Sequence, residues 1–205
     1  MRFLAIFTAL VAFVSTPAMA TEEPQYRVVE RIGAVEIREY APMIVAEVIV
    51  RGDVASAPSR GFRPLANYIF GDNAPREDIA MTAPVTAQRR GAEIAMTAPV
   101  TAQPVGDDVW TVAFIMPSEW TMESLPEPND PDVTIRELPA QRMAVLGFRG
   151  GRSERLHARM EAELRATLDQ AGVETSGEVM GAFYSGPWVP QPFRRNEIWI
   201  EVAAP

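Results

Sequence analysis

The feature that most constrains the fold is an internal repeat. The segment VEIRE at residues 35–39 recurs as VTIRE at residues 133–137, and the match runs without a gap as far as residues 52 and 150. Each unit is expected to form two strands separated by a proline-containing turn, followed by a helix. Such duplicated strand-strand-helix units predict an α+β fold, in which a pseudo-twofold antiparallel sheet or distorted open barrel has two helices packed on it.

The two helices are expected at residues 61–70 and 152–171. The first has apolar residues at helical spacing and requires Pro64 to lie in its first turn, where a missing N–H is harmless. The second has Ser153 as its N-cap and a glycine at its end. The expected core face of the first helix consists of Phe62, Leu65, Ala66, Ile69 and Phe70. Further strands are expected at residues 26–31, 110–116, 179–184 and 197–202.

A second repeat is shorter and identical in both copies. The sequence IAMTAPVTAQ occupies residues 79–88 and again residues 94–103. A hairpin of two paired strands is the simplest interpretation. Each copy contains a proline that cannot donate to a sheet ladder, so we expect these strands at an edge or bulged at Pro84 and Pro99.

The first twenty residues resemble a secretory signal peptide. Arg2 precedes an apolar run over residues 3–14, and a small-residue stretch ends at Ala20. The run is shorter than the roughly 20 residues of a spanning helix, so we predict cleavage between Ala20 and Thr21 and no stable membrane insertion afterwards. The expected product is one domain, residues 21–205, in the periplasm or secreted.

Composition excludes several classes of chemistry. The chain has no cysteine, one histidine and a formal net charge of −8, and all of its basic residues are arginine. Thiolate chemistry and a lysine Schiff base are therefore impossible. Nucleic acid is a poor partner for so acidic a chain. The sequence identifies no protein partner.

Five motifs in fixed order carry a family resemblance. They are GFRPLANYIFG at residues 61–71, IAMTAPV in both short repeats, FIMP at 114–117, PEPNDP at 126–131 and RRNE at 194–197. By these motifs the chain resembles the SOUL haem-binding protein family. The resemblance implies the same fold and a haem or related tetrapyrrole, bound non-covalently in an apolar groove beside the first helix. It implies a groove formed by Arg63, Leu65, Asn67, Tyr68, Ile69, Tyr184 and Arg194, with Arg63 and Arg194 as propionate partners.

Axial ligation of the iron is a separate question. In the animal SOUL protein a histidine is thought to ligate iron at a place that Glu39 occupies here, and a carboxylate is a poorer ligand than imidazole. The single histidine, His157, lies at the edge of the apolar stripe of the second helix and is the candidate metal ligand. Met81, Met96 and Met116 are further candidates, although methionine in strands usually fills core space.

Two other functions remain open at this stage. The first is an enzyme acting on a porphyrin-like ligand, with Glu39 or Tyr68 transferring a proton. The carboxylates of Glu36, Glu39 and Glu137 could face one another, but pairing with Arg38 and Arg136 in a solvated ladder is the simpler interpretation. The second is a small-molecule sensor or protein-interaction module that does not bind haem. No catalytic motif supports the enzyme, so a binding protein of the periplasm for storage, scavenging or transfer is preferred.

Overall fold

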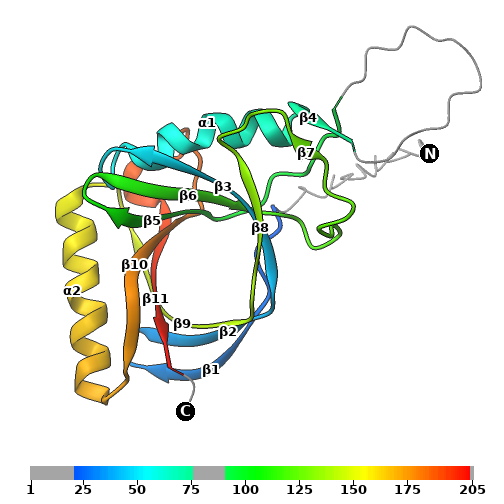
Figure 1. Cartoon of the computed structure of the whole chain (residues 1–205). Helices are drawn as coiled ribbons and strands as arrows, with labels where there is room; N and C mark the ends of the chain where they lie inside the picture. The colour runs from blue at the N-terminus through cyan, green and yellow to red at the C-terminus, as the bar shows by residue number, and fades with distance from the viewer. Residues whose placement is uncertain (1–20, 76–90, 204–205) are drawn as a thin grey trace, which may run out of the picture.

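The fold is known from a computed structural model, which describes residues 21–75 and 91–203 (Figure 1). The expected signal peptide, residues 1–20, lies outside the described residues. So does the first copy of the short repeat, residues 79–88.

The described residues form a nine-stranded antiparallel sheet. Its order is β1-β2-β9-β11-β10-β5-β6-β3-β8, with β1 and β8 at the two ends, so the sheet is not closed into a barrel. The strands are β1 (Tyr26–Ile32), β2 (Val35–Tyr40), β3 (Met43–Arg51), β5 (Val100–Gly106), β6 (Val109–Ile115), β8 (Thr134–Leu138), β9 (Gln141–Arg149), β10 (Thr175–Phe183) and β11 (Arg195–Val202). Two short strands, β4 (Asn73–Ala74) and β7 (Glu127–Pro128), pair separately.

Two helices pack on the outer side of the curved sheet (Figure 1). The first, α1 (Ala57–Ile69), contacts β3, β5 and β6, and the second, α2 (Glu154–Ala171), contacts β9 and β11. Each helix covers its own cluster of buried apolar side chains. The α+β prediction is therefore confirmed. In the described part of the chain, no helix has the length and apolarity needed to cross a bilayer.

The two strand-strand-helix segments predicted from the long repeat are both present. The strands cross-pair, because β2 lies beside β9 and β3 beside β8. Ile37 stands opposite Ala144, and Ala46 stands opposite Ile135. These four residues occupy matching positions of the two units, but descent of the units from one ancestral segment stays a prediction.

Helix α1 begins earlier than predicted. Asp53 caps the segment before it, since its carboxylate accepts the backbone N–H groups of Ala55 and Ser56 at 3.0 and 2.7 Å. Pro58 then occupies the first turn, the position that the sequence analysis gave to Pro64. Pro64 lies inside the helix instead. The helix start was wrong because two prolines could satisfy the same rule.

The predicted core face of α1 is correct only in part. Leu65, Ala66 and Ile69 are buried, but the side chain of Phe62 is 36% exposed and that of Phe70 is 62% exposed. Phe70 follows the last residue of the helix and so no longer obeys helical spacing. Phe62 lies at the flank of the buried stripe. Its ring packs edge-on against the ring of Phe114, with 5.3 Å between the two ring centroids.

Gly61 allows α1 to approach the sheet closely. A Cβ at this position would lie 2.7 Å from Cγ1 of Val112, a buried residue of β6. Only a residue without a side chain fits between helix and strand here. Gly61 therefore sets the short distance between helix α1 and strand β6.

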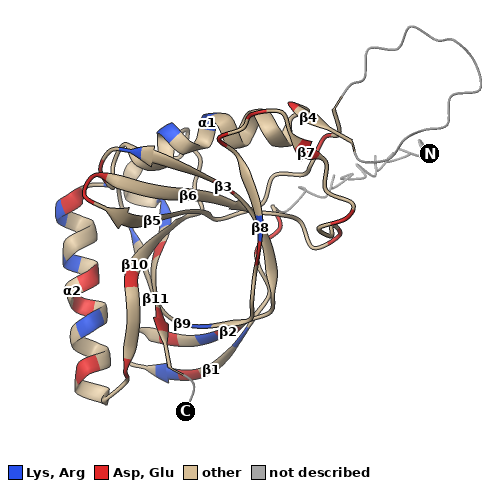
Figure 2. Cartoon of the chain, in the orientation of Figure 1, with Lys and Arg blue, Asp and Glu red and all other residues tan. Residues whose placement is uncertain are grey.

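Helix α2 has the predicted ends. The hydroxyl of Ser153 accepts the backbone N–H of Leu156, and Gly172 adopts the left-handed conformation at the C-terminus. Charges of both signs follow each other along its outer face (Figure 2). Glu161 and Arg165 form the expected pair four residues apart at 2.9 Å.

The second copy of the short repeat is a strand only in its second half. β5 begins at Val100, immediately after Pro99, and residues 94–99 contain one isolated bridge, from Thr97 to Glu22. Pro99 has no N–H to donate, so the ladder starts after it. The prediction of a strand over all of residues 94–103 was therefore wrong.

Candidate functional site

An apolar groove runs beside the N-terminal half of α1 and has a volume of about 270 Å³. We call it the α1 groove. Its apolar lining comes from Pro58 and Phe62 of the helix, Met96, Val100 of β5, Phe183 of β10 and Trp188 of the following loop. Aromatic side chains from three separate parts of the chain thus meet around one concave surface, which suits a flat apolar ligand.

One cation lines this groove without an anionic partner. Arg152, just before α2, places its guanidinium carbon 5.4 Å from the centre of the Phe183 ring. Within the described residues it forms no ion pair. Burial, and then the positive charge of Arg194, lower the pKa of Arg152. A carboxylate bound in the groove would stabilise this charge.

The loop that carries Trp188 is fixed by Arg194. Its guanidinium donates from Nε to the carbonyl of Val189 at 2.8 Å and from Nη2 to that of Pro187 at 3.0 Å. The Trp188 side chain is 80% exposed although it lines the groove. Arg194, predicted to bind a propionate, therefore has loop carbonyls as its partners and acts on the groove by positioning Trp188.

The other predicted groove residues lie mostly elsewhere. Leu65, Tyr68 and Ile69 are buried in the core under α1, and the Tyr68 hydroxyl donates to the carbonyl of Pro126 at 2.9 Å. Arg63 and Asn67 are exposed and do not line the groove. Among the described residues, Tyr184 is the one member of the predicted set that lines the α1 groove. Phe62, Phe183, Trp188 and Arg152 also line the groove and are not in the predicted set.

His157, the predicted metal ligand, is buried in α2. Its side chain is 8% exposed, and its Nε2 has no hydrogen-bond partner in the described part of the chain. Burial lowers the pKa of His157, and the nearby charge of Glu161 opposes this shift without reversing it. The imidazole lies against Gly181 of β10 and does not line the α1 groove. The described residues contain no cluster of three metal-binding side chains.

The inner face of the sheet, which is turned away from the helices, carries a buried charge network. At its centre is Glu197 of β11, whose carboxylate accepts hydrogen bonds from Tyr184 at 2.7 Å, Trp199 at 2.8 Å and Arg38 at 3.1 Å. The Arg38 and Glu197 side chains are 8% and 4% exposed. Arg195 completes the network at 3.3 Å.

The ionisation of Glu197 follows from these contacts. Burial acts to raise the pKa of Glu197, but the hydrogen bond from Tyr184 and the charge of Arg38 outweigh it, and the pKa lies below its ordinary value. For Arg38, burial acts to lower the pKa, but Tyr40 and Glu197 raise it overall. Both groups are charged at neutral pH, and each oxygen of the carboxylate already has donors, so the network is structural.

Two of the three carboxylates considered for acid–base chemistry, those of Glu36 and Glu39, are paired with arginines. Glu36 contacts Arg31 and Arg38 at 2.8 Å, and Glu39 contacts Arg27 at 2.6 Å. The predicted pairing with Arg38 is thus confirmed for Glu36, although Arg38 is buried rather than solvated, and the partner of Glu39 is Arg27 instead. Arg136 differs, because its partner is Glu47 of the neighbouring strand.

Comparisons with solved structures show the fold. The C-terminal domain of EcmrR superimposes with a TM-score of 0.58 at 11% identity, covering 87% of this chain and 98% of that one. A hydrolase from Listeria innocua superimposes with a TM-score of 0.53 at 13% identity, covering 89% and 93%. At such identities the likeness concerns the fold alone.

Comparisons with known sequences are more specific. Heme-binding protein 2 of Homo sapiens is 29% identical over 189 residues, which cover 89% of this chain and 87% of that protein. Heme-binding protein 2 of Mus musculus is 29% identical over 187 residues, covering 88% and 86%. A family model described as SOUL heme-binding protein matches residues 21–201.

Proposed function

Because the chain belongs to the SOUL heme-binding protein family, we propose that it binds haem or a related tetrapyrrole non-covalently. The observation that carries the proposal is the α1 groove, in which Phe62, Phe183 and Trp188 surround a concave apolar surface. Burial of the ligand's apolar faces supplies the affinity, at roughly 25 cal/mol per Å². A volume of about 270 Å³ is small for a ligand site, so the ring enters edge-first and remains partly in solvent.

Arg152 supports this proposal as the partner of a propionate. It is the guanidinium that lines the groove, and the described residues leave it without a carboxylate. The two arginines expected for this role are placed differently, since Arg63 points to solvent and Arg194 holds loop carbonyls. A charge-assisted hydrogen bond to a half-buried arginine contributes about 1.5 to 3 kcal/mol.

A haemin titration of the chain from Thr21 tests the proposal. We expect saturable one-to-one binding with a shifted Soret band. His157 does not line the groove, so a His157→Ala variant is expected to give the same band position and the same affinity as the unchanged chain. An altered band in the variant would identify the imidazole as an axial ligand. A non-saturating response would contradict tetrapyrrole binding.

Replacing Arg152 by glutamine is expected to weaken haemin binding about tenfold, because one ion pair is lost. Arg159→Gln, on the exposed face of α2, is the matched control and should leave the affinity unchanged. The dimethyl ester of protoporphyrin lacks free carboxylates, so the Arg152 variant should bind it as the unchanged chain does. Equal losses for haemin and the ester would contradict a propionate contact.

The cellular role extends the same proposal. We expect an exported protein that takes part in storage, scavenging or transfer of tetrapyrroles in the periplasm. The support is the segment before Thr21, which resembles a signal peptide, together with a family match that begins at residue 21. Detection of the chain in the periplasmic fraction, with Thr21 as its N-terminal residue, is the expected result.

A further inference from the structure

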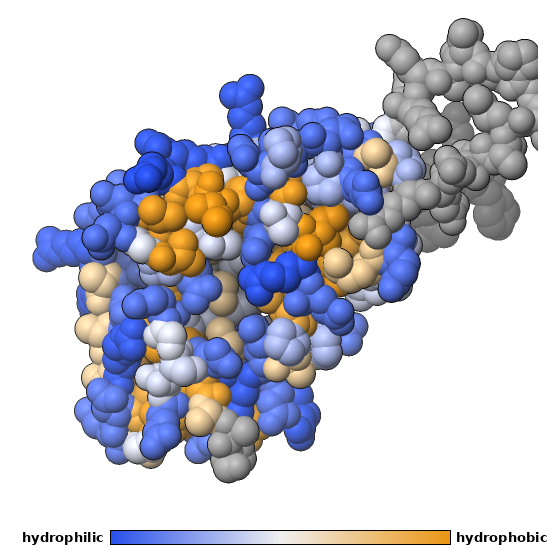
Figure 3. Space-filling view, viewed as in Figure 1, coloured by the Kyte–Doolittle hydropathy of each residue, from blue (hydrophilic) through white to orange (hydrophobic). Residues whose placement is uncertain are grey.

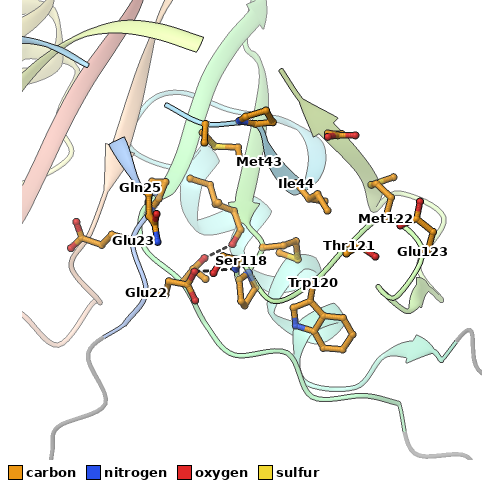
Figure 4. A pocket seen from close by; sticks show the side chains of 18 residues that line it. Glu22, Glu23, Gln25, Met43, Ile44, Ser118, Trp120, Thr121, Met122 and Glu123 are labelled. Atoms are coloured by element: carbon orange, nitrogen blue, oxygen red, sulfur yellow. Dashed lines mark hydrogen bonds between the residues drawn. The ribbon is translucent and has the colours of Figure 1, made fainter. Parts of the chain in front are cut away.

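A second cavity, of about 490 Å³, shares one lining residue with the α1 groove, Thr97, and is otherwise lined by different residues. Figure 4 shows this cavity from close by. It is bounded by residues 22–25 before β1, the turn between β2 and β3, the end of β6 and the loop over residues 117–123. Glu137 of β8 completes the lining. Its size is within the usual range for small-molecule sites. We call it the acidic cavity.

The apolar part of this lining is rich in methionine. It consists of Met43, Ile44, Ile115, Met116, Trp120 and Met122. Thioether side chains are flexible and polarisable, so they adapt to ligands of varied shape and pack well on aromatic rings. In the described residues, the indole N–H of Trp120 is buried without an acceptor.

Figure 3 shows apolar surface on this side of the molecule, beside β8, and a separate patch over β3, β5 and β6.

The charged side chains in the described lining are all negative. Four carboxylates line the cavity, from Glu22, Glu23, Glu123 and Glu137, and none of the arginines in the described residues does. Glu23 is neutralised by Arg195 at 2.7 Å. Glu22 accepts the backbone N–H of Ser118 at 3.0 Å and has no arginine partner in the described part of the chain. Glu137 likewise has none there.

Glu22 is exposed, but two hydrogen bonds fix its position. Its backbone carbonyl accepts the N–H of Ala98 at 2.8 Å, and its carboxylate accepts the N–H of Ser118. Figure 4 shows Glu22 and Glu123 on opposite sides of the group of side chains drawn, with Ile44 between them. The negative charges thus border an apolar centre.

We propose that the acidic cavity binds an amphipathic organic cation, of the class of protonated aromatic amines. The ring would lie among the methionines and Trp120, where a cation near the indole face is further stabilised. The ammonium group would lie near Glu22 and Glu137. The same charges disfavour carboxylate ligands, so this site and the Arg152-bearing α1 groove select ligands of opposite charge.

A matched series of three naphthalenes tests the proposal by calorimetry on the chain from Thr21. The probes are 1-naphthylmethylamine, which is a cation at neutral pH, the neutral 1-naphthylmethanol and the anionic 1-naphthoate. At low ionic strength we expect the amine to bind at least fivefold more tightly than the alcohol, and the naphthoate most weakly. Salt should reduce the preference for the amine. Equal affinities of amine and alcohol, or no saturable binding, would overturn the proposal.

Carboxylate variants locate the binding. In the double variant Glu22→Gln with Glu137→Gln, amine affinity should fall three- to tenfold while alcohol affinity stays the same. The glutamine amide can still accept the Ser118 N–H, so the fold is retained. Glu30→Gln, on exposed β1, removes one charge outside the cavity and should change neither affinity. A double variant that keeps its preference for the amine would exclude this cavity as the site.

Discussion

Replacing Glu197 by alanine is expected to lower the free energy of unfolding by about 3 to 5 kcal/mol, because the buried charge of Arg38 then keeps only Glu36 as a carboxylate partner and the donors of Tyr184 and Trp199 lose their acceptor. Urea denaturation followed by tryptophan fluorescence measures the change. The matched control is Glu39→Ala, which removes a carboxylate from a pair whose side chains are 76% and 40% exposed. That change should cost less than about 1 kcal/mol.

A second variant separates the lost charge from the lost volume. Arg38→Met combined with Glu197→Ala removes both ions, so it should recover a large part of the stability lost in the single variant. If Glu197→Ala costs no more than Glu39→Ala, the inner-face network does not stabilise the fold. If the double variant is less stable than the single one, the other contacts of Arg38, with Glu36, Tyr40 and Tyr26, contribute more than the relief of its buried charge.

The same network predicts a pH dependence. The pKa of Glu197 in the folded chain lies below the ordinary value of 4.5, so the unfolded chain binds a proton first as the solution is acidified. The contribution of Glu197 is fully present above about pH 4.5 and is lost as the pH falls toward the lower folded pKa. The Glu197→Ala variant should therefore lose less stability than the unchanged chain over this acid range.

Changing Gly61 to alanine should lower the free energy of unfolding by about 1 to 3 kcal/mol, because the new methyl group overlaps the buried side chain of Val112. This result opposes helix propensity, by which alanine is better than glycine by roughly 0.5 to 1 kcal/mol. Gly147→Ala is the control, since a Cβ there meets nothing within 4 Å. It should change stability by less than about 0.5 kcal/mol.

Relief of the overlap provides the decisive comparison. In a chain that already has Val112→Ala, the change Gly61→Ala should cost much less than in the unchanged chain, because the space is then free. Thermal or urea denaturation of the four proteins gives the coupling between the two sites. Equal costs in both backgrounds would show that the close approach of α1 to β6 does not limit the residue at position 61.

The pattern of apolar residues predicted the strands and helices well, because burial on one side of an element leaves a regular period in the sequence. Ile198, Ile200 and Val202 alternate along β11 and are buried under α2. The start of α1 could not be placed, because Pro58 and Pro64 both fit a first turn. The end of its apolar stripe was also misplaced, since Phe70 lies past the helix.

The candidate site was harder to predict, because its residues come from separate elements. Phe62, Phe183 and Trp188 meet only after α1, β10 and the following loop are placed together. Helical spacing placed Leu65 and Ile69 on the apolar face of α1. Spacing alone could not distinguish a side chain buried in the core from one that faces a ligand. The Arg38–Glu197 pair joins residues 159 positions apart, and no local pattern reports it.

The N-terminal segment lies between the two cavities and contributes to both. Thr21 lines the α1 groove, Glu22 lines the acidic cavity, and Thr97, to which Glu22 is bridged, lines both. Because both cavities share this wall, a ligand that shifts the wall at one site changes the shape of the other site. Binding at the two sites would then be cooperative, and the factor by which an amine changes haem affinity must equal the factor by which haem changes amine affinity.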